Sequence, residues 1–358
     1  MALRQGSKQR FLGWEVGQMR TAPGGNGRSR AKRPTMIDVA REAGVALRTV
    51  SRVVNNDPTV GPDYVARVQS AIKALNFRPD ERARQLRTGV SDTIGAAVRR
   101  IAETNPALAA IEQTARAAGL TLLASSTDFD EQREHDILIS MCRQRLDGVI
   151  VEPIGESHSY LESELAAGMP LVAMDRPMSG VSVDTVMSDN AGGIGMAFHH
   201  LRKHGHKRVA YIGDDERVFS GHERAAAFRA CLLAHGGPTD GLIHPGELTA
   251  ERVGAALDAA LHGPDPATAL VTGNMDTTLA VLRRLGPEAA RLPIVGFDDV
   301  PLADLLSPAL TVVAQDTARI GATAVELLRA RIADPARPVQ SVVVPVSMTI
   351  RGSGEIRP

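Results

Sequence analysis

Between residues 35 and 75 the apolar positions recur at the three- and four-residue spacings of amphipathic helices. Thr35 is a suitable N-cap with Asp38 completing a variant of the capping box, Gly44 fits a left-handed C-cap, and Pro62 suits the first turn of a later helix. The apolar positions are Ile37, Val39 and Ala40, then Val50, Val53 and Val54, then Val65, Val68, Ile72 and Leu75. Three short helices, the first two joined by a tight glycine turn, predict a helix-turn-helix unit.

After residue 90 short apolar runs alternate with Ala-rich helical stretches. The predicted strands are 93–98, 120–125, 148–151, 171–174, 208–212, 269–272, 294–297 and 342–346. The predicted helices between them include 108–118, 192–203, 223–235, 250–261 and 277–285. This alternation predicts an α/β fold with parallel sheets covered on both faces. Because the strands exceed one comfortable doubly wound sheet, two lobes are the simplest division.

The distribution of charge along the chain gives an indication of function that the pattern of apolar residues does not. The formal net charge is zero, yet residues 1–89 hold 17 Lys/Arg against 7 Asp/Glu, and residues 90–358 hold 24 against 34. Such asymmetry favours a nucleic-acid-binding end joined to an acidic body, although a solvated basic tail is the simpler alternative. For residues 1–34 we expect a disordered basic tail, which is either an arm that touches phosphates or a passive extension.

Composition excludes several classes of protein. No run reaches the roughly 18 apolar residues of a membrane helix, and arginines and lysines interrupt the N-terminus where a secretion signal would need an apolar stretch. With only Cys142 and Cys231 there is neither a disulfide framework nor a paired-cysteine metal motif. We therefore expect a cytoplasmic protein.

Motifs in both parts of the chain resemble the lactose-repressor (LacI) family of bacterial transcriptional regulators. In the N-terminal part they are TMIDVAREAGV at 35–45, TVSRVVN at 49–55, Arg78-Pro79 and LRTG at 86–89. In the remainder they are DGVI at 147–150, GMPLV at 168–172, DRP at 175–177, His200-Leu201 with Gly205-His206, and VGFDD at 295–299. The resemblance implies an all-α helix-turn-helix headpiece, a hinge helix, and a two-lobed core like periplasmic binding proteins.

The resemblance also implies domain boundaries, because in this family the chain crosses three times between the lobes. The headpiece is expected at 35–89, with the hinge helix at about 78–88, and the effector-binding and dimerisation core at 90–358. We expect lobe one at about 90–189 and 317–341, and lobe two at about 190–316 and 342–358.

DNA-contacting residues follow from the docking of this motif, whose second helix presents its first residues to base edges in the major groove. Leu47 and Arg48 fall on the family's specificity-setting pair. Arg48 can bond guanine with two donors, and Leu47 can contact a thymine methyl. The alternative makes Leu47 a packing residue and Arg48 a solvated charge. The further candidates for phosphates and base edges are Thr35, Thr49, Ser51, Arg52 and Asn55.

Within the hinge, Leu86 occupies the position of a family leucine that wedges into the minor groove and kinks the duplex. Arg84 and Arg87 can hold the flanking phosphates.

Effector contacts are expected at the carboxyl ends of the parallel strands, between the lobes. By resemblance Arg224, Asn274 and Asp298 bond ligand hydroxyls or carboxylates; alternatively, Asp298 caps a turn and Arg224 pairs with a nearby acid. The other candidates are Ala107, Leu108, Asp175, Ser220, Leu248 and Asp276. Where relatives often have aromatic residues, this chain has Ala107-Leu108 and Leu248. The effector is therefore expected to be a polyhydroxylated sugar or an acidic sugar derivative, oriented by polar contacts.

Other chemistry finds little support. His199, His200, His204 and His206 suggest a metal site, but the stretch reads as the end of a helix, so we expect no metal and no cofactor. Phosphate-loop, nucleophile-elbow and activated-cysteine motifs are missing, which argues against an enzyme acting on a sugar or nucleoside. We expect a homodimeric DNA-binding regulator, a repressor on a pseudo-palindromic operator. The alternative is a solute-binding protein without DNA function.

Overall fold

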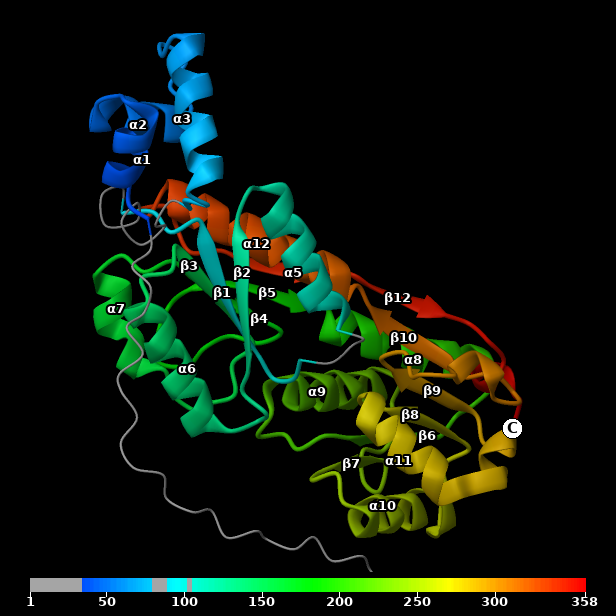
Figure 1. The fold of residues 1–358 in the computed structure, drawn as a ribbon. Helices are drawn as coiled ribbons and strands as arrows, with labels where there is room; N and C mark the ends of the chain where they lie inside the picture. Colours follow the sequence, from blue (N-terminus) through cyan, green and yellow to red (C-terminus); the bar gives the residue numbers. More distant parts are fainter. Residues whose placement is uncertain (1–33, 79–88, 102–104) are drawn as a thin grey trace, which may run out of the picture. The chain divides into compact units, whose positions relative to one another are not determined.

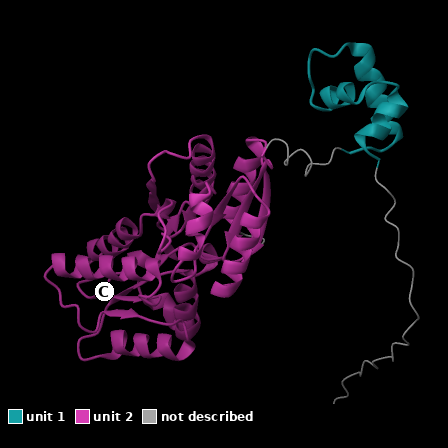
Figure 2. Cartoon of the chain, turned by 90° about the vertical axis from the view of Figure 1, so that its left-hand side faces the viewer, with its two compact units in different colours: residues 1–84 teal, residues 85–358 magenta. Residues whose placement is uncertain are grey.

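The computed structural model describes residues 34–78, 89–101 and 105–358. It divides the chain into a unit that ends at Arg84 and a unit that begins at Gln85, which we call the headpiece and the core unit (Figure 2). The predicted tail, and the hinge helix with Arg84, Leu86 and Arg87, lie outside the described residues.

The described residues of the headpiece form three helices, as the sequence predicts. They are α1 (Met36–Ala43), α2 (Leu47–Val54) and α3 (Pro62–Ala74). Val39, Val50 and Val68, one from each helix, are fully buried and pack into a common core. Burying a valine side chain contributes about 1.5–3 kcal/mol, so each of these three residues stabilises the unit by about that amount.

The helix ends of the headpiece confirm the expected caps. Thr35 and Asp38 form a reciprocal capping box at the start of α1, and Gly44 ends that helix with φ 61° and ψ 42°. Arg67 of α3 donates two hydrogen bonds to the Ala43 carbonyl, at 3.0 and 2.6 Å, and one to the Gly44 carbonyl, at 2.8 Å. The turn that sets the angle between α1 and α2 is thus held by a side chain from the third helix.

Two six-stranded sheets form the core unit, one in each lobe (Figure 1). The first has the order β11-β5-β4-β3-β1-β2 and is parallel throughout. Its strands are β1 (Thr93–Val98), β2 (Thr121–Ser126), β3 (Gly148–Val151), β4 (Leu171–Met174), β5 (Asp184–Ser188) and β11 (Ser341–Val344). One face packs on α5 (Pro106–Ala117) and α12 (Thr317–Ala333), and the other on α6 (Glu131–Arg143), η1 (Ser159–Leu161) and α7 (Glu162–Ala166).

The second sheet has the order β12-β10-β9-β8-β6-β7, with only β12 antiparallel. Its strands are β6 (Val209–Gly213), β7 (Ile243–Pro245), β8 (Ala269–Thr272), β9 (Ile294–Phe297), β10 (Thr311–Gln315) and β12 (Val346–Thr349). Its helices are α8 (Asn190–Lys203), α9 (Phe219–Ala234), α10 (Ala250–His262) and α11 (Met275–Leu285), with short helices η2 (Gly286–Arg291), η3 (Ala303–Leu305) and η4 (Ser353–Glu355). Figure 1 shows the sheet between the α8–α9 pair and the α10–α11 pair.

The chain crosses between the lobes three times, but the last crossing differs from the prediction. The expected single strand 342–346 is two strands: β11 pairs with β5 in lobe one, and β12 pairs with β10 in lobe two. Pro345 separates them, because proline lacks the backbone N–H that a continuous ladder needs. Lobe two therefore resumes at Val346 rather than at residue 342. Among the described residues, no helix is long and apolar enough to cross a bilayer.

Candidate functional site

On the headpiece, the start of α2 presents an exposed surface. Leu47 is 47% exposed although it is apolar, and Arg48 beside it is exposed and makes no hydrogen bond or ion pair with the described residues. Val50 and Val53 face inward. Leu47 is therefore not a core residue, and both side chains are free to meet another molecule. Thr49 and Ser51 are half-buried on the same helix.

Two of the predicted phosphate contacts are engaged within the headpiece. Arg52 Nε lies 2.9 Å from Asp57 Oδ2, and its guanidinium also contacts the Thr59 hydroxyl. These bonds hold the pKa of Asp57 well below its usual range. Asn55 Nδ2 donates to the Ser51 carbonyl at 2.7 Å. Both residues thus fix the end of α2, as Thr35 fixes the start of α1.

In the core unit, charged side chains gather where strands of both sheets end, forming what we call the interlobe cluster. Its members are Arg99, Glu152, Asp175, Arg176, Asn190, Arg224, Asp298 and Gln315. Arg99, Glu152 and Asp175 directly follow β1, β3 and β4, and Asp298 directly follows β9. Parallel strands bring these residues to one edge of each sheet because their carboxyl ends all point the same way.

Arg224 is the most constrained member of the interlobe cluster. Its side chain is only 5% exposed; Nε donates to Asn190 Oδ1 and Nη1 to the Gly273 carbonyl, each at 2.7 Å. Nη1 lies 3.8 Å from Asp298 Oδ2, and the guanidinium carbon sits 3.7 Å from the centroid of the Phe297 ring. The structure thus brings Arg224 and Asp298 together, as both the ligand-binding prediction and its ion-pair alternative require.

Both strand-end aspartates have left-handed backbones, which is unusual for residues with a Cβ. Asp175 has φ 74° and Asp298 has φ 69°. Such strain of about 1–3 kcal/mol persists where surrounding structure imposes it, and it concentrates at functional sites. Asp298 Oδ1 accepts a hydrogen bond from Gln315 Nε2 at 2.6 Å. Burial works to raise the pKa of Asp175, but attraction to Arg99, Arg176 and Arg224 outweighs it and lowers that pKa.

The remaining effector candidates lie in varied surroundings. Asn274 caps α11 and donates to Asp214 Oδ2 at 3.3 Å, and half-buried Ser220 precedes Arg224 by one helical turn. Asp276 is exposed at the start of α11, and Leu248 is 36% exposed. Leu108 is half-buried in the first turn of α5.

Ala107 departs from its predicted place. It is buried against α12, where its carbonyl approaches Gly321 so closely that a Cβ on Gly321 would lie 2.3 Å from it. The packing of α5 on α12 therefore occupies this residue, and its side chain does not belong to the interlobe cluster.

The four histidines near the end of α8 are occupied separately. His199 and His204 contact backbone carbonyls one turn earlier, at 2.6 and 2.9 Å, and His200 contacts the Glu355 carboxylate. His206 is buried between the Thr268 hydroxyl and the Ile356 carbonyl. Within the described ranges no three His, Cys, Asp or Glu side chains are grouped to hold a metal ion.

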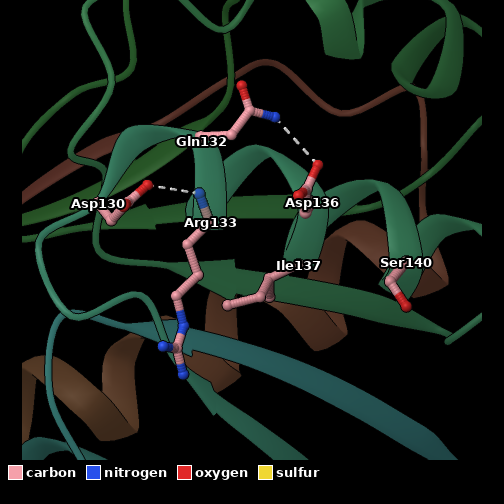
Figure 3. Close-up of a pocket in the computed structure, with 6 residues that line it drawn as sticks. All are labelled: Asp130, Gln132, Arg133, Asp136, Ile137 and Ser140. Carbon is pink, nitrogen blue, oxygen red and sulfur yellow. Dashed lines mark hydrogen bonds between the residues drawn. The ribbon is translucent and has the colours of Figure 1, made fainter.

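A surface hollow lies along α6 and shares no residue with the interlobe cluster. Figure 3 shows its lining, of which Asp130 caps the helix and Gln132 donates to Asp136 at 3.1 Å. The other lining residues are Arg133, Ile137 and Ser140. Most of these side chains are exposed and come from one helix face, and the hollow contains none of the predicted effector residues.

Comparison with known proteins identifies the family of this chain. The model of bacterial regulatory proteins of the lacI family matches residues 35–80, and that of the periplasmic binding protein-like domain matches residues 198–354. The HTH-type transcriptional regulator PtxS of Pseudomonas plecoglossicida is 31% identical over 335 residues, covering 91% of this chain and 97% of the relative. The chain belongs to the LacI family.

Further relatives of this LacI-family chain agree. The ribose operon repressor of Escherichia coli K12 is 30% identical over 89% of this chain and 99% of its own. The lac repressor dimer bound to operator and the anti-inducer ONPF superposes with a TM-score of 0.78 at 24% identity, covering 90% of this chain and 99% of that one, which shows the fold. A CelR–cellobiose complex has a TM-score of 0.63 at 28% identity, covering 90% and 100%.

These findings confirm the predicted fold class: a helical headpiece and two lobes with parallel sheets. The chain is a DNA-binding transcriptional regulator and not an enzyme. The alternative of a solute-binding protein without DNA function is wrong, because the headpiece itself matches the family model.

For this LacI-family regulator, sequence reasoning missed several members of the interlobe cluster. Arg99, Glu152 and Gln315 were not among the candidates, although each stands at the carboxyl end of a strand. The rule that selected Asp175 and Asp298 also selects Arg99 and Glu152, but not Gln315, because the sequence pattern predicts no strand that ends there. Asn190 gave no such signal, since only the packing of α8 beside α9 brings it to Arg224.

Proposed function

We propose that this LacI-family regulator acts as a homodimeric repressor on a pseudo-palindromic operator, read by the exposed start of α2. Leu47 and Arg48 meet base edges, while Thr49 and Ser51, together with Thr35, Arg52 and Asn55, contact the neighbouring backbone. The support is an exposed apolar side chain beside an exposed cationic one that makes no hydrogen bond or ion pair with the described residues, both on the first turn of the second helix. Such a regulator works in the cytoplasm, at the nucleoid.

We propose further that a sugar or an acidic sugar derivative binds between the lobes and controls operator affinity. The observation that supports this most is the convergence of Arg224 and Asp298, a buried donor fork beside a strained acceptor. Asn274, Asp175 and Ser220 stand at neighbouring strand and helix ends and complete the polar lining. Leu108, Leu248 and Asp276 supply the rim.

Regulation requires that the ligand bind one arrangement of the lobes better than the other. Ser188 and Gln315 lie at the ends of β5 and β10, immediately before two of the crossings, and their side chains are hydrogen-bonded to each other. Gln315 also donates a hydrogen bond to Asp298. A ligand that binds Asp298 would therefore affect the hydrogen bonds of the residues beside the crossings. We infer that a ligand-driven shift of the lobes in turn changes the operator affinity of the headpieces of a dimer.

Operator binding against a metabolite panel tests the proposal. Full-length wild type is compared with Arg224→Ala and Asp298→Ala by fluorescence anisotropy, and the sign of the response shows whether the ligand releases or promotes binding. Arg229→Ala on the same helix and Asp299→Ala, whose carboxylate bonds Arg351 instead, are matched controls. Only the first two variants should lose the effector response while binding operator normally. If Arg224→Ala or Asp298→Ala shows a wild-type effector response, the effector site lies elsewhere.

A further inference from the structure

Arg99 lies in a bridge of opposite charges within lobe one. Its Nε is 3.6 Å from Glu152 Oε2 and its Nη2 is 3.2 Å from Asp175 Oδ2, and its backbone N–H donates to Glu152 Oε2 at 2.8 Å. Attraction to Asp175, and then to Glu152 and Asp298, raises the pKa of Arg99 despite its burial. Glu152 is only 12% exposed and Asp175 only 19%. The bridge is therefore a largely buried ion-pair chain with Arg99 at its centre.

The ion-pair bridge around Arg99 in lobe one and the Arg224–Asp298 pair in lobe two attract each other. Arg99 of lobe one is drawn to Asp298 of lobe two, and Asp175 of lobe one to Arg224 of lobe two. The charged members of the interlobe cluster are the cations Arg99, Arg176 and Arg224 and the anions Glu152, Asp175 and Asp298. Their charges cancel, so the cluster itself carries no net charge.

Polar atoms suited to hydroxyl groups remain available in this neutral cluster. Oδ1 of Asp175 and Oδ2 of Asp298 accept no hydrogen bond from the described residues, and Nη2 of Arg224 donates none to them. The Phe297 ring is fully buried beneath the guanidinium of Arg224, so it offers no face for stacking. A hydroxyl can donate to an aspartate and accept from an arginine without displacing either from its partner.

We propose that Arg99 and Glu152 determine effector specificity, admitting a neutral polyhydroxylated ligand such as an aldose or alditol and rejecting the corresponding carboxylate. A ligand carboxylate could bond two nitrogens of Arg99 only by displacing Asp175 from Nη2, because both bidentate edges of the guanidinium include that nitrogen. The displaced Asp175 would then be a largely buried charge whose one remaining ion pair is the 3.4 Å contact with Arg176, which is strongly unfavourable. This inference rests on the proposed effector site between the lobes, and it narrows the class of ligand to its neutral members.

Isothermal titration calorimetry on the full-length protein tests this with paired probes: ribose and ribonate, glucose and gluconate, galactose and galactonate. Wild type should bind the neutral member of the preferred pair at least about tenfold more tightly than its acid, corresponding to about 1.4 kcal/mol. Glu152→Gln keeps an oxygen for the Arg99 backbone N–H but leaves the cluster with one net positive charge. Its neutral-to-acid affinity ratio should shift by about tenfold or more toward the acid.

Two further variants make the outcome decisive. Glu156→Gln changes an exposed glutamate of the same loop and should leave the ratio at its wild-type value. Arg99→Gln removes the central cation and should move the ratio in the opposite direction, toward the neutral ligand. The affinity ratio of Arg99→Gln keeps the test valid if Glu152→Gln fails to fold, and a thermal unfolding measurement would show such a failure.

Three results would overturn the specificity assignment: wild type preferring the acid, Glu152→Gln and Glu156→Gln giving the same ratio, or no probe of either kind binding. Operator binding measured in parallel separates these failures from a failure of the regulatory function. A protein that binds operator normally but shows any of these results retains its role as a DNA-binding regulator and loses only this assignment.

Discussion

Replacing Gly44 with alanine perturbs the turn that positions α2 against α1. Gly44 is left-handed, with φ 61°, and its N–H bonds the Ala40 and Arg41 carbonyls at the end of α1. An added Cβ would lie 2.8 Å from Nη2 of Arg67, the atom that bonds the Ala43 and Gly44 carbonyls. The substitution therefore strains the backbone and displaces the side chain that ties α3 to the turn.

The cost can be worked from these contacts. A left-handed alanine costs about 1–2 kcal/mol. Losing a hydrogen bond of Arg67 costs about 1 kcal/mol more, because the displaced guanidinium is partly solvated and regains water. A total of about 2–3 kcal/mol is large for so small a unit, and it corresponds to a change of about 30- to 150-fold in the unfolding equilibrium.

Hydrogen exchange of the full-length protein measures this effect in each unit separately. Amides of α1 and α2 should exchange about 30-fold faster or more in Gly44→Ala, while amides of α12 in the core unit keep their wild-type rates. Gly236→Ala is the matched control: Gly236 is also left-handed, with φ 66°, but its added Cβ meets no atom within 4 Å. It should show the cost of backbone strain alone, at the end of α9. If headpiece amides in Gly44→Ala exchange at wild-type rates, the reasoning about this turn is refuted.

Three other predictions concern single side chains. Arg48→Ala should weaken binding to the cognate operator by about 1–3 kcal/mol but should hardly change binding to random DNA, as measured by fluorescence anisotropy. Equal losses on both DNAs would show that Arg48 contacts phosphates. The Arg52 guanidinium lowers the pKa of Asp57, so the stability this pair contributes is present above about pH 4 and is lost as pH falls toward the folded-state pKa. An NMR titration of the Asp57 carboxyl should show its midpoint rise toward the ordinary value in Arg52→Gln, and an unmoved midpoint contradicts the assigned cause. Burial raises the pKa of Cys142 to about 11, so only about one thiol in a thousand is ionised at pH 8. Native Cys142 should therefore react with iodoacetamide far more slowly than in the unfolded chain, and equal rates would show that it is not shielded.

The sequence by itself determined the local features of this protein. Thr35, Gly44 and Pro62 were placed at helix ends because their backbone and side-chain preferences act within a few residues. Continuous apolar runs identified β1, β3, β4, β8 and β9 because both faces of these strands are buried. The family followed from motifs that stand in order along the chain.

The pattern of apolar residues does not predict strands that contain buried polar residues. β5 begins at Asp184, whose fully buried carboxylate is held by Arg331 of α12 at 3.0 and 3.1 Å and by the Gln340 backbone N–H. These partners lie about 150 residues away along the chain. Hydropathy alone counts such a residue as exposed, because the compensation that permits its burial is not local.

Only the tertiary structure decided which strand ends meet and which charges pair there. Strand-end position suggested Asp175 and Asp298, but sheet order and the return of the chain across the lobes placed Arg99, Glu152 and Gln315 beside them. The same packing removed Ala107 from the candidate site by burying it against α12. Local backbone preferences are encoded within a few residues, whereas the partner of a buried charge depends on contacts between segments far apart in the chain, and only folding brings those together.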